Sequence, residues 1–161
     1  MTGADTVKCF MGIDPGLRGG IAFYFPSKPD TASVYDMPVA GKEIDVAGIA
    51  RLVAQYMPDA AFVEAVHAMP RQGVSSTFRF GVAYGAVLGV LGACHIETHL
   101  VTPKRWQKHF HLIGGDKEQS RALALRLFPA RAEMFAKKKN ENRAEAVLIA
   151  RYGAETSGDI E

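Results

Sequence analysis

Apolar residues near the start of the chain fall in two short runs separated by a turn. Lys8 to Ile13 and Ile21 to Phe25 are rich in β-branched and aromatic residues, and Asp14 to Gly20 between them contains glycine and proline. This pattern predicts a β-hairpin. A third short strand is expected at Ser33 to Met37, so three successive strands begin the fold.

Further along, the spacing of apolar residues becomes helical. From Ile44 to Tyr56 they recur at intervals of three and four residues, which predicts an amphipathic helix that ends before Pro58. Ala60 to Val63 then forms a short apolar strand that leads into Glu64, and a fifth strand is expected at about Ile96 to Val101. After its first three strands, the chain therefore alternates between helix and strand.

The longest uncharged run extends from Phe80 to Cys94 and is expected to be a buried helix. It is shorter than the roughly 18 to 20 residues that cross a bilayer, so no membrane span is expected. Gly81, Gly85 and Gly89 recur at every fourth position. Such a face either packs tightly against a sheet or forms the seam of a dimer.

Three more helices are expected in the last third of the chain: Pro103 to Phe110, Asp116 to Leu127 and about Glu141 to Tyr152. Gly153 to Glu161 is expected to be a disordered tail. The sequence shows no internal repeat or linker, so residues 1–152 are expected to form a single α/β domain.

The order of these elements predicts a mixed five-stranded sheet with helices packed on it. A hairpin joins the first strands, and a right-handed crossover helix is expected to return the fourth strand parallel to the first. Ligands of open α/β sheets gather at the carboxyl ends of strands. Asp14 and Glu64 stand at two such ends.

Four acidic residues are candidate metal ligands. Asp14 leaves a strand for a Pro-Gly turn, although an aspartate that merely caps the turn would give the same pattern. Glu64 follows an apolar strand, where a charge is costly unless a cation pairs with it; a surface glutamate is the alternative. Glu141 and Glu145 share one helix face, either as ligands or as an ordinary salt-bridged face. Such carboxylates suit Mg²⁺, and two ions would support phosphodiester hydrolysis.

Composition bears on the size of the domain, the redox state of the cysteines and the cellular compartment. With 161 residues and 48% hydrophobic content, the chain suits one domain with a sizeable core. Cys9 and Cys94 lie in apolar stretches without metal-site spacing and are expected to be reduced thiols. Met1 to Lys8 has no apolar run after a basic start, so no targeting signal is expected and the protein should stay in the cytoplasm.

Charge is unevenly distributed along the chain. Residues 101–143 hold eleven Lys or Arg against four Asp or Glu, a net charge of +7, whereas the rest holds eight against thirteen. This asymmetry predicts a polyanionic partner such as nucleic acid, with a solvated basic face as the alternative.

Taken together, four motifs resemble the RuvC-type Holliday junction resolvases, and most closely their bacteriophage-borne branch. The motifs are G-I-D-P-G at Gly12 to Gly16, V-E-A-V-H-A-M-P-R-Q-G at Val63 to Gly73, V-T-P-K-R-W-Q-K at Val101 to Lys108, and R-A-E-A at Arg143 to Ala146. The resemblance implies a ribonuclease H-like fold, a homodimer, and dependence on Mg²⁺ or Mn²⁺ with two ions per site. It also implies paired nicks in four-way junctions, in a bacterial or phage-infected cell, without a small-molecule cofactor.

By position, Asp14, Glu64 and Glu145 match the family's catalytic carboxylates, and Lys117 falls near a lysine thought to assist catalysis. The family has an aspartate where this chain has Asn142. Glu141, one residue earlier, is the substitute expected to complete the site, and an amide ligand or water contact from Asn142 is the alternative.

A second departure lies in the segment that follows the fourth strand. The family carries an aromatic residue where this chain has His67, so base stacking is expected to fall to His67, Met69, Arg71 or Phe78. Trp106 is either a stacking platform or a core residue. Contacts to DNA are expected from these side chains: His67, Arg71, Gln72, Ser75, Ser76, Arg79, Lys104, Arg105, Lys137, Lys138 and Lys139.

The leading functional hypothesis is a structure-selective DNA endonuclease that resolves four-way junctions. A ribonuclease H-like nuclease for another substrate would share its carboxylates, and Asn142 leaves open a catalytically silent junction-binding module. An actin-like nucleotide-binding domain would need a second domain for which 161 residues are too few. The pairs His95 and His99, and His109 and His111, lack the accompanying residues of a transition-metal site.

Overall fold

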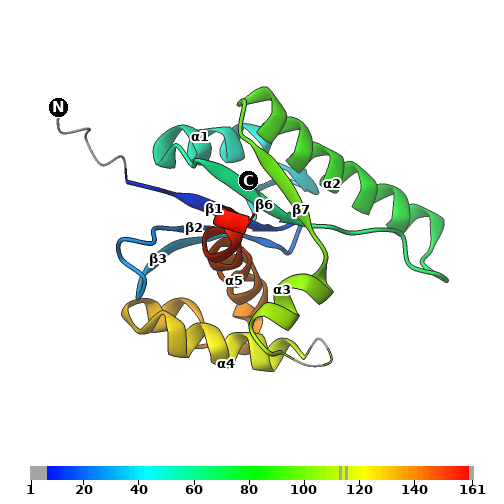
Figure 1. The fold of residues 1–161 in the computed structure, drawn as a ribbon. Helices are drawn as coiled ribbons and strands as arrows, with labels where there is room; N and C mark the ends of the chain where they lie inside the picture. The colour runs from blue at the N-terminus through cyan, green and yellow to red at the C-terminus, as the bar shows by residue number, and fades with distance from the viewer. Residues whose placement is uncertain (1–6, 113, 115, 160–161) are drawn as a thin grey trace.

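A twisted sheet of five strands forms the centre of the computed structural model, which describes residues 7–112, 114 and 116–159 (Figure 1). Across the sheet the strand order is β3-β2-β1-β6-β7. The strands are β1 (Phe10–Asp14), β2 (Gly20–Tyr24), β3 (Ala32–Asp36), β6 (Ala60–Glu64) and β7 (Thr98–Val101). The first three pair antiparallel, whereas β6 and β7 run parallel to β1. The predicted hairpin and mixed five-stranded sheet are confirmed.

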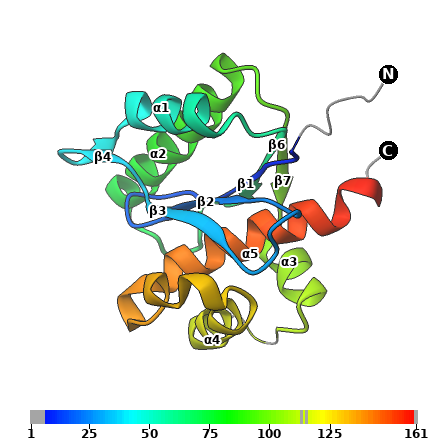
Figure 2. The same ribbon diagram turned by 90° about the vertical axis from the view of Figure 1, so that its left-hand side faces the viewer.

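Helices cover both faces of the sheet (Figure 2). On one face lie α1 (Val46–Tyr56) and α2 (Val74–Ala93); on the other lie α3 (Pro103–His109), α4 (Lys117–Leu127) and α5 (Glu141–Thr156). Each face has its own hydrophobic cluster. Alternate strand residues belong to different clusters, because successive side chains of a strand point to opposite faces.

The central helix α5 packs directly on β1. Gly12 faces this helix, and a Cβ atom there would collide with the backbone of Ala146 and Ala150. Only glycine at this strand position therefore lets the helix axis come so close to the sheet. Residues Ala144 to Ala150 are all buried as a result.

The C-terminal segment corrects an expectation. Gly153 does not begin a disordered tail: it lies in α5, buried against the ring of Phe62, and the helix continues to Thr156. A 3-10 turn follows at Ser157–Asp159. Residues 160 and 161 lie outside the described residues, as do residues 1–6 of the N-terminal segment from which the cytoplasmic expectation came.

Helix α2 corrects a second expectation. By length and composition alone, α2 is long and apolar enough to cross a membrane. The uncharged run from Phe80 to Cys94 was expected to be buried. In the structure only Ala83, Val87 and Leu91 are buried. These positions recur every fourth residue and form the single stripe that packs on the sheet. The prediction of a buried helix is therefore wrong: most of α2 is exposed.

Smaller differences lie at element ends. A short hairpin, β4 (Val39–Ala40) and β5 (Glu43–Ile44), was not expected from the sequence, and its turn has Gly41 at φ 63°. The next helix starts after Ile44 because Asp45 caps it, accepting a hydrogen bond of 3.0 Å from the Gly48 backbone N–H. Cys9 and Cys94 are free thiols, as expected.

Candidate active site

Two carboxylates stand side by side at the carboxyl ends of β1 and β6. Ile13 pairs with Val63 in parallel register, so Asp14 and Glu64 are the next residues on neighbouring strands. On both strands the preceding residues that face α5 are two and four positions earlier. Because a strand alternates with a period of two, Asp14 and Glu64 point to the same face as α5. Both are only half-buried.

The third carboxylate comes from α5. Glu145 is 8% exposed and is the only charged residue among the buried residues that the structure describes. The close approach of α5 to Gly12 brings this residue to the end of β1, where its charge acts on Asp14.

Burial and mutual repulsion raise the pKa values of these three carboxyl groups. Burial, followed by the charges of Glu145 and Glu64, raises the pKa of Asp14 to about 8. Burial also raises the pKa of Glu64 and that of Glu145. Three acids held in this way lack positive charge, which a divalent cation would supply.

Lys117, at the first position of α4, provides some of that charge. Its Nζ lies 3.7 Å from Oε2 of Glu145 and donates a hydrogen bond of 3.0 Å to Oδ1 of Asn142. The amide nitrogen of Asn142 in turn donates to the backbone carbonyl of Arg18 in the β1–β2 turn. Asn142 thus links α4, α5 and the turn after Asp14.

The structure separates the two candidates for a fourth ligand position. Asn142 lines the groove beside Asp14, whereas Glu141 is not among its lining residues. Burial is the main cause of the raised pKa of Glu145, and the charge of Glu141 adds a smaller contribution in the same direction. Its role as a ligand stays a prediction.

The donor set suits a hard cation with an open coordination shell. Within residues 7–112, 114 and 116–159, no three Asp, Glu, His or Cys side chains converge as tightly as the ligands of one caged ion. Mg²⁺ is typically held by one or two carboxylates together with waters and substrate phosphates. Asp14, Glu64 and Glu145, beside an open groove, fit that kind of site.

A groove of about 830 Å³ opens in front of Asp14. The β1–β2 turn, the start of α2, and the pair Lys117 and Asn142 line it. Of the predicted DNA contacts, Ser75, Ser76 and Arg79 line this groove. Arg79 donates a hydrogen bond of 3.4 Å to Oγ of Ser75.

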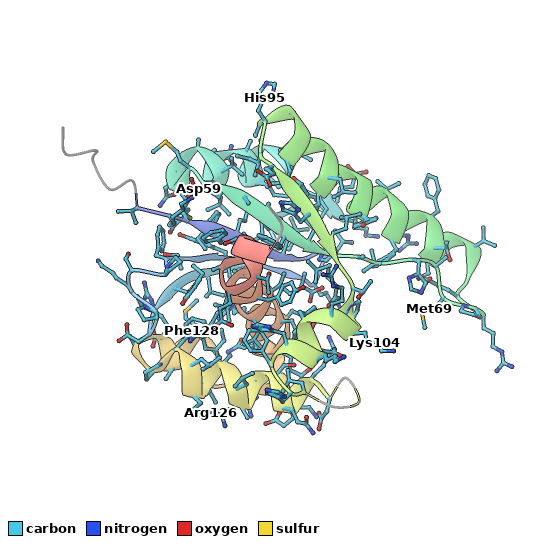
Figure 3. All side chains as sticks on the ribbon, viewed as in Figure 1. Asp59, Met69, His95, Lys104, Arg126 and Phe128 are labelled. Carbon is cyan, nitrogen blue, oxygen red and sulfur yellow. The ribbon has the colours of Figure 1, made fainter. Side chains whose placement is uncertain are left out.

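The other predicted contacts are spread around the groove. His67 and Arg71 are exposed on the β6–α2 loop, where Gln72 donates a hydrogen bond of 3.2 Å to Oγ of Ser76. Lys104 and Arg105 are exposed on α3, and Lys137, Lys138 and Lys139 are exposed just before α5. Figure 3 shows Met69 and Lys104 on the same side of the molecule, with Arg126 away from them.

Trp106 contacts the carboxylates in a way that the sequence did not predict. It is 0% exposed, so the core interpretation is right and the stacking platform is wrong. Its Nε1 also donates a hydrogen bond of 2.8 Å to Oε2 of Glu64. The signal was indirect, because it depends on the register that pairs Glu64 with Val101, five residues before the tryptophan.

The histidine pairs show no metal geometry in the described part of the chain. His99 contacts Glu97 at 2.6 Å and stacks on Phe62, and His109 contacts Glu155 at 2.6 Å. These contacts give both histidines structural partners other than Asp14, Glu64 and Glu145.

A mixed sheet that carries three carboxylates at its strand ends and on its central helix defines a domain of the ribonuclease H-like class. The structure is similar to that of T. thermophilus RuvC in complex with a Holliday junction substrate. Its TM-score is 0.67, with 18% identity over 94% of this chain and 96% of that chain. A second Thermus thermophilus RuvC structure gives 0.58 with 15% identity, covering 92% and 96%.

The yeast mitochondrial Holliday junction resolvase Ydc2 gives a TM-score of 0.56 with 15% identity, covering 98% of this chain and 83% of that chain. At such identities, likeness shows the fold. The predicted ribonuclease H-like fold and the resemblance to RuvC-type resolvases are therefore confirmed. The bacteriophage branch stays a prediction.

Sequence similarity points the same way. Over 106 residues, 65% of this chain, the protein is 33% identical to the chloroplastic Holliday junction resolvase MOC1 of Chlamydomonas reinhardtii. The chain spans 12% of the length of that relative. No protein-family profile matches the chain.

Proposed function

We propose that this protein is a structure-selective DNA endonuclease that resolves four-way junctions by metal-dependent phosphodiester hydrolysis. The observation that carries the proposal is the cluster of Asp14, Glu64 and Glu145 with Lys117, at an open groove that Asp14 and Lys117 line. Its raised carboxyl pKa values are typical of a cation site. The similar proteins named above are Holliday junction resolvases, which supports a branched substrate.

Asp14, Glu64 and Glu145 would hold Mg²⁺ or Mn²⁺, with Glu141 or Asn142 at the edge of the site. Such ions, two in the arrangement we propose, supply an activated water and charge stabilisation for the leaving oxygen. Lys117 lies within reach of the same groove and places a positive charge where the phosphate becomes more negative. Asn142 fixes this ammonium by accepting its hydrogen bond.

DNA would lie along the groove and the basic surface around it. Ser75 and Ser76 belong to the first turn of α2, where free backbone N–H groups favour a phosphate, and Arg79 follows one turn later. Met69 is 63% exposed beside this turn. Its apolar side chain is available to stack on unpaired bases at the branch point, the role for which His67 was also a candidate.

A homodimer would place two such sites across one junction. The glycine positions of α2 have open space where a Cβ would stand, so this face does not pack against the sheet. Successive residues of a helix are turned by about 100°, so the glycine face lies opposite the stripe formed by Ala83, Val87 and Leu91. Val74, Phe78 and Val82 share this open face and are at least half exposed.

The test is an assay on two labelled substrates, a four-way junction and a linear duplex of the same sequence, each with Mg²⁺ or EDTA. We expect cleavage of the junction alone and only with Mg²⁺. Cleavage of both substrates would favour a less selective nuclease. Tight junction binding without cleavage would favour a silent binding module.

A further inference from the structure

We propose that Trp106 is a positioning residue for Glu64: its indole N–H fixes the orientation of this carboxylate for binding a divalent cation. The inference rests on the proposed function, because it takes Glu64 to be a metal ligand. Trp106 itself touches neither the substrate nor the ion.

The first support is the way the fold delivers the indole to this carboxylate. Glu64 pairs with Val101 across β6 and β7, and the backbone N–H of Ala65 donates a hydrogen bond of 2.7 Å to the Val101 carbonyl. Chain direction then changes at once, since α3 begins at Pro103. Trp106, in the first turn of α3, is thereby turned back over the end of β6.

The second support is that the indole has no freedom to point elsewhere. Trp106 is fully buried in the cluster that includes Leu123 and Val147 on α4 and α5. A ring packed in this way keeps one orientation, so its single N–H donor stays aimed at Oε2 of Glu64 at 2.8 Å. The carboxylate is therefore held by the core and not by a mobile surface side chain.

The third support is the charge of the donor. An indole N–H is neutral, so it orients Glu64 without neutralising it, whereas the ammonium of Lys117 partly neutralises Glu145 at 3.7 Å. The indole engages Oε2, and Oε1 stays available to a cation. Outer partners that orient ligating groups commonly contribute 10- to 100-fold to metal affinity or activity.

The experiment removes the N–H while keeping the ring. Trp106 is replaced by L-3-benzothienylalanine, an isostere that carries sulfur in place of the N–H, and in a second protein by phenylalanine (Trp106→Phe). Binding of Mn²⁺ is measured by electron paramagnetic resonance, and thermal unfolding reports the fold. Phe128→Leu, a fully buried residue of the same cluster, is the matched control for a disturbed core.

We expect the isostere to bind Mn²⁺ about 10- to 100-fold more weakly than wild type, with Phe128→Leu unchanged. Trp106→Phe should match the isostere, and metal-free junction binding should stay at the wild-type value in both. An isostere with wild-type Mn²⁺ affinity would overturn this inference alone. Wild-type protein that binds Mn²⁺ but leaves junctions uncut would instead contradict the proposed function.

Discussion

The ammonium of Lys117 donates a hydrogen bond to the side-chain carbonyl of Asn142, at 3.0 Å, in the groove that Asp14 also lines. Asn142 stands where the similar family has a carboxylate. An amide accepts this bond without adding negative charge, so it holds the lysine while leaving the ammonium less neutralised than a carboxylate would. The pair therefore favours an electrostatic role for Lys117 in the reaction itself.

This role predicts that loss of the ammonium slows cleavage without weakening metal binding. Lys117→Met should slow single-turnover junction cleavage by about 100-fold, the effect of removing one group that stabilises developing charge. The same change should leave Mn²⁺ affinity equal or higher. Burial raises the pKa of Asp14 and of Glu64, and the positive charge of Lys117 opposes that rise. The same charge repels a cation, so its removal does not weaken cation binding. Lys117→Arg is the charge-preserving control. A parallel loss of Mn²⁺ binding in Lys117→Met would contradict this assignment.

Asp14→Asn is expected to abolish cleavage while junction binding stays largely intact, because a metal ligand is lost and the basic surface is not. Rate measurements with saturating Mg²⁺ test the loss of cleavage, and gel-shift titrations with EDTA test junction binding. Nicking at a near wild-type rate would show that the carboxylates are misassigned.

The same substitution has a pH-dependent effect on folding. Asp14 has a pKa of about 8 when folded against about 3.9 when unfolded, so the native state holds a proton that the unfolded chain releases. Stability of the metal-free protein should therefore fall as pH rises from about 4 to 8. Asn at this position does not titrate, so Asp14→Asn removes this loss. One pKa unit corresponds to about 1.4 kcal/mol, so the free energy of unfolding of the variant relative to wild type should rise by a few kcal/mol between pH 5 and pH 8.

Urea unfolding at pH 5 and pH 8 in EDTA measures this gain. The control is Asp36→Asn, because the bidentate contact with Arg143 lowers the pKa of Asp36. A lowered pKa contributes stability that is present above the unfolded value, so this control should lose stability at pH 8. If Asp14→Asn also loses stability there, the carboxylates do not repel one another as described.

The basic segment before α5 is expected to contact phosphates. Replacing Lys137, Lys138 and Lys139 with alanine should weaken junction binding and flatten its salt dependence by about one to three units of slope. The matched control replaces Lys28, Arg126 and Arg131, three exposed cations that are not among the residues lining the groove beside Asp14. Equal slopes for the lysine variant and wild type would move the DNA path to Arg71, Arg79, Lys104 and Arg105.

The open face of α2 predicts a dimer that a single charge disrupts. Phe78→Glu should yield monomers by sedimentation velocity at micromolar concentration, because a carboxylate would be buried in an apolar seam. Met57→Glu changes an equally exposed apolar residue away from this face and should leave the dimer intact. Wild-type protein that sediments as a monomer both alone and with junction DNA would rule out the seam.

The sequence predicted the parts of the site that depend on local pattern. Asp14 and Glu64 each end an apolar run, so their place at strand ends followed from the residues beside them. The bond from Trp106 to Glu64 depends on the pairing of two distant strands, and the contact of Lys117 with Asn142 depends on how α4 docks on α5. No local pattern contains that information.

Two misjudged segments have physical causes of the same kind. An uncharged run such as Phe80 to Cys94 suggests burial, yet hydropathy does not distinguish a core from a face left open for a partner. Helix α2 buries only one stripe. A glycine near the end of a helix suggests that the helix stops, but Gly153 continues α5 because it fits beneath the ring of Phe62.

On the proposed function, the carboxylate cluster cuts both strands of a branched junction. The most direct measurement labels two opposing strands of one four-way junction with different fluorophores and maps the nicks made with Mg²⁺. We predict paired nicks at symmetric positions that yield ligatable linear duplexes, absent in Asp14→Asn. Nicks confined to one strand, or equal cutting of the matched linear duplex, would contradict junction resolution.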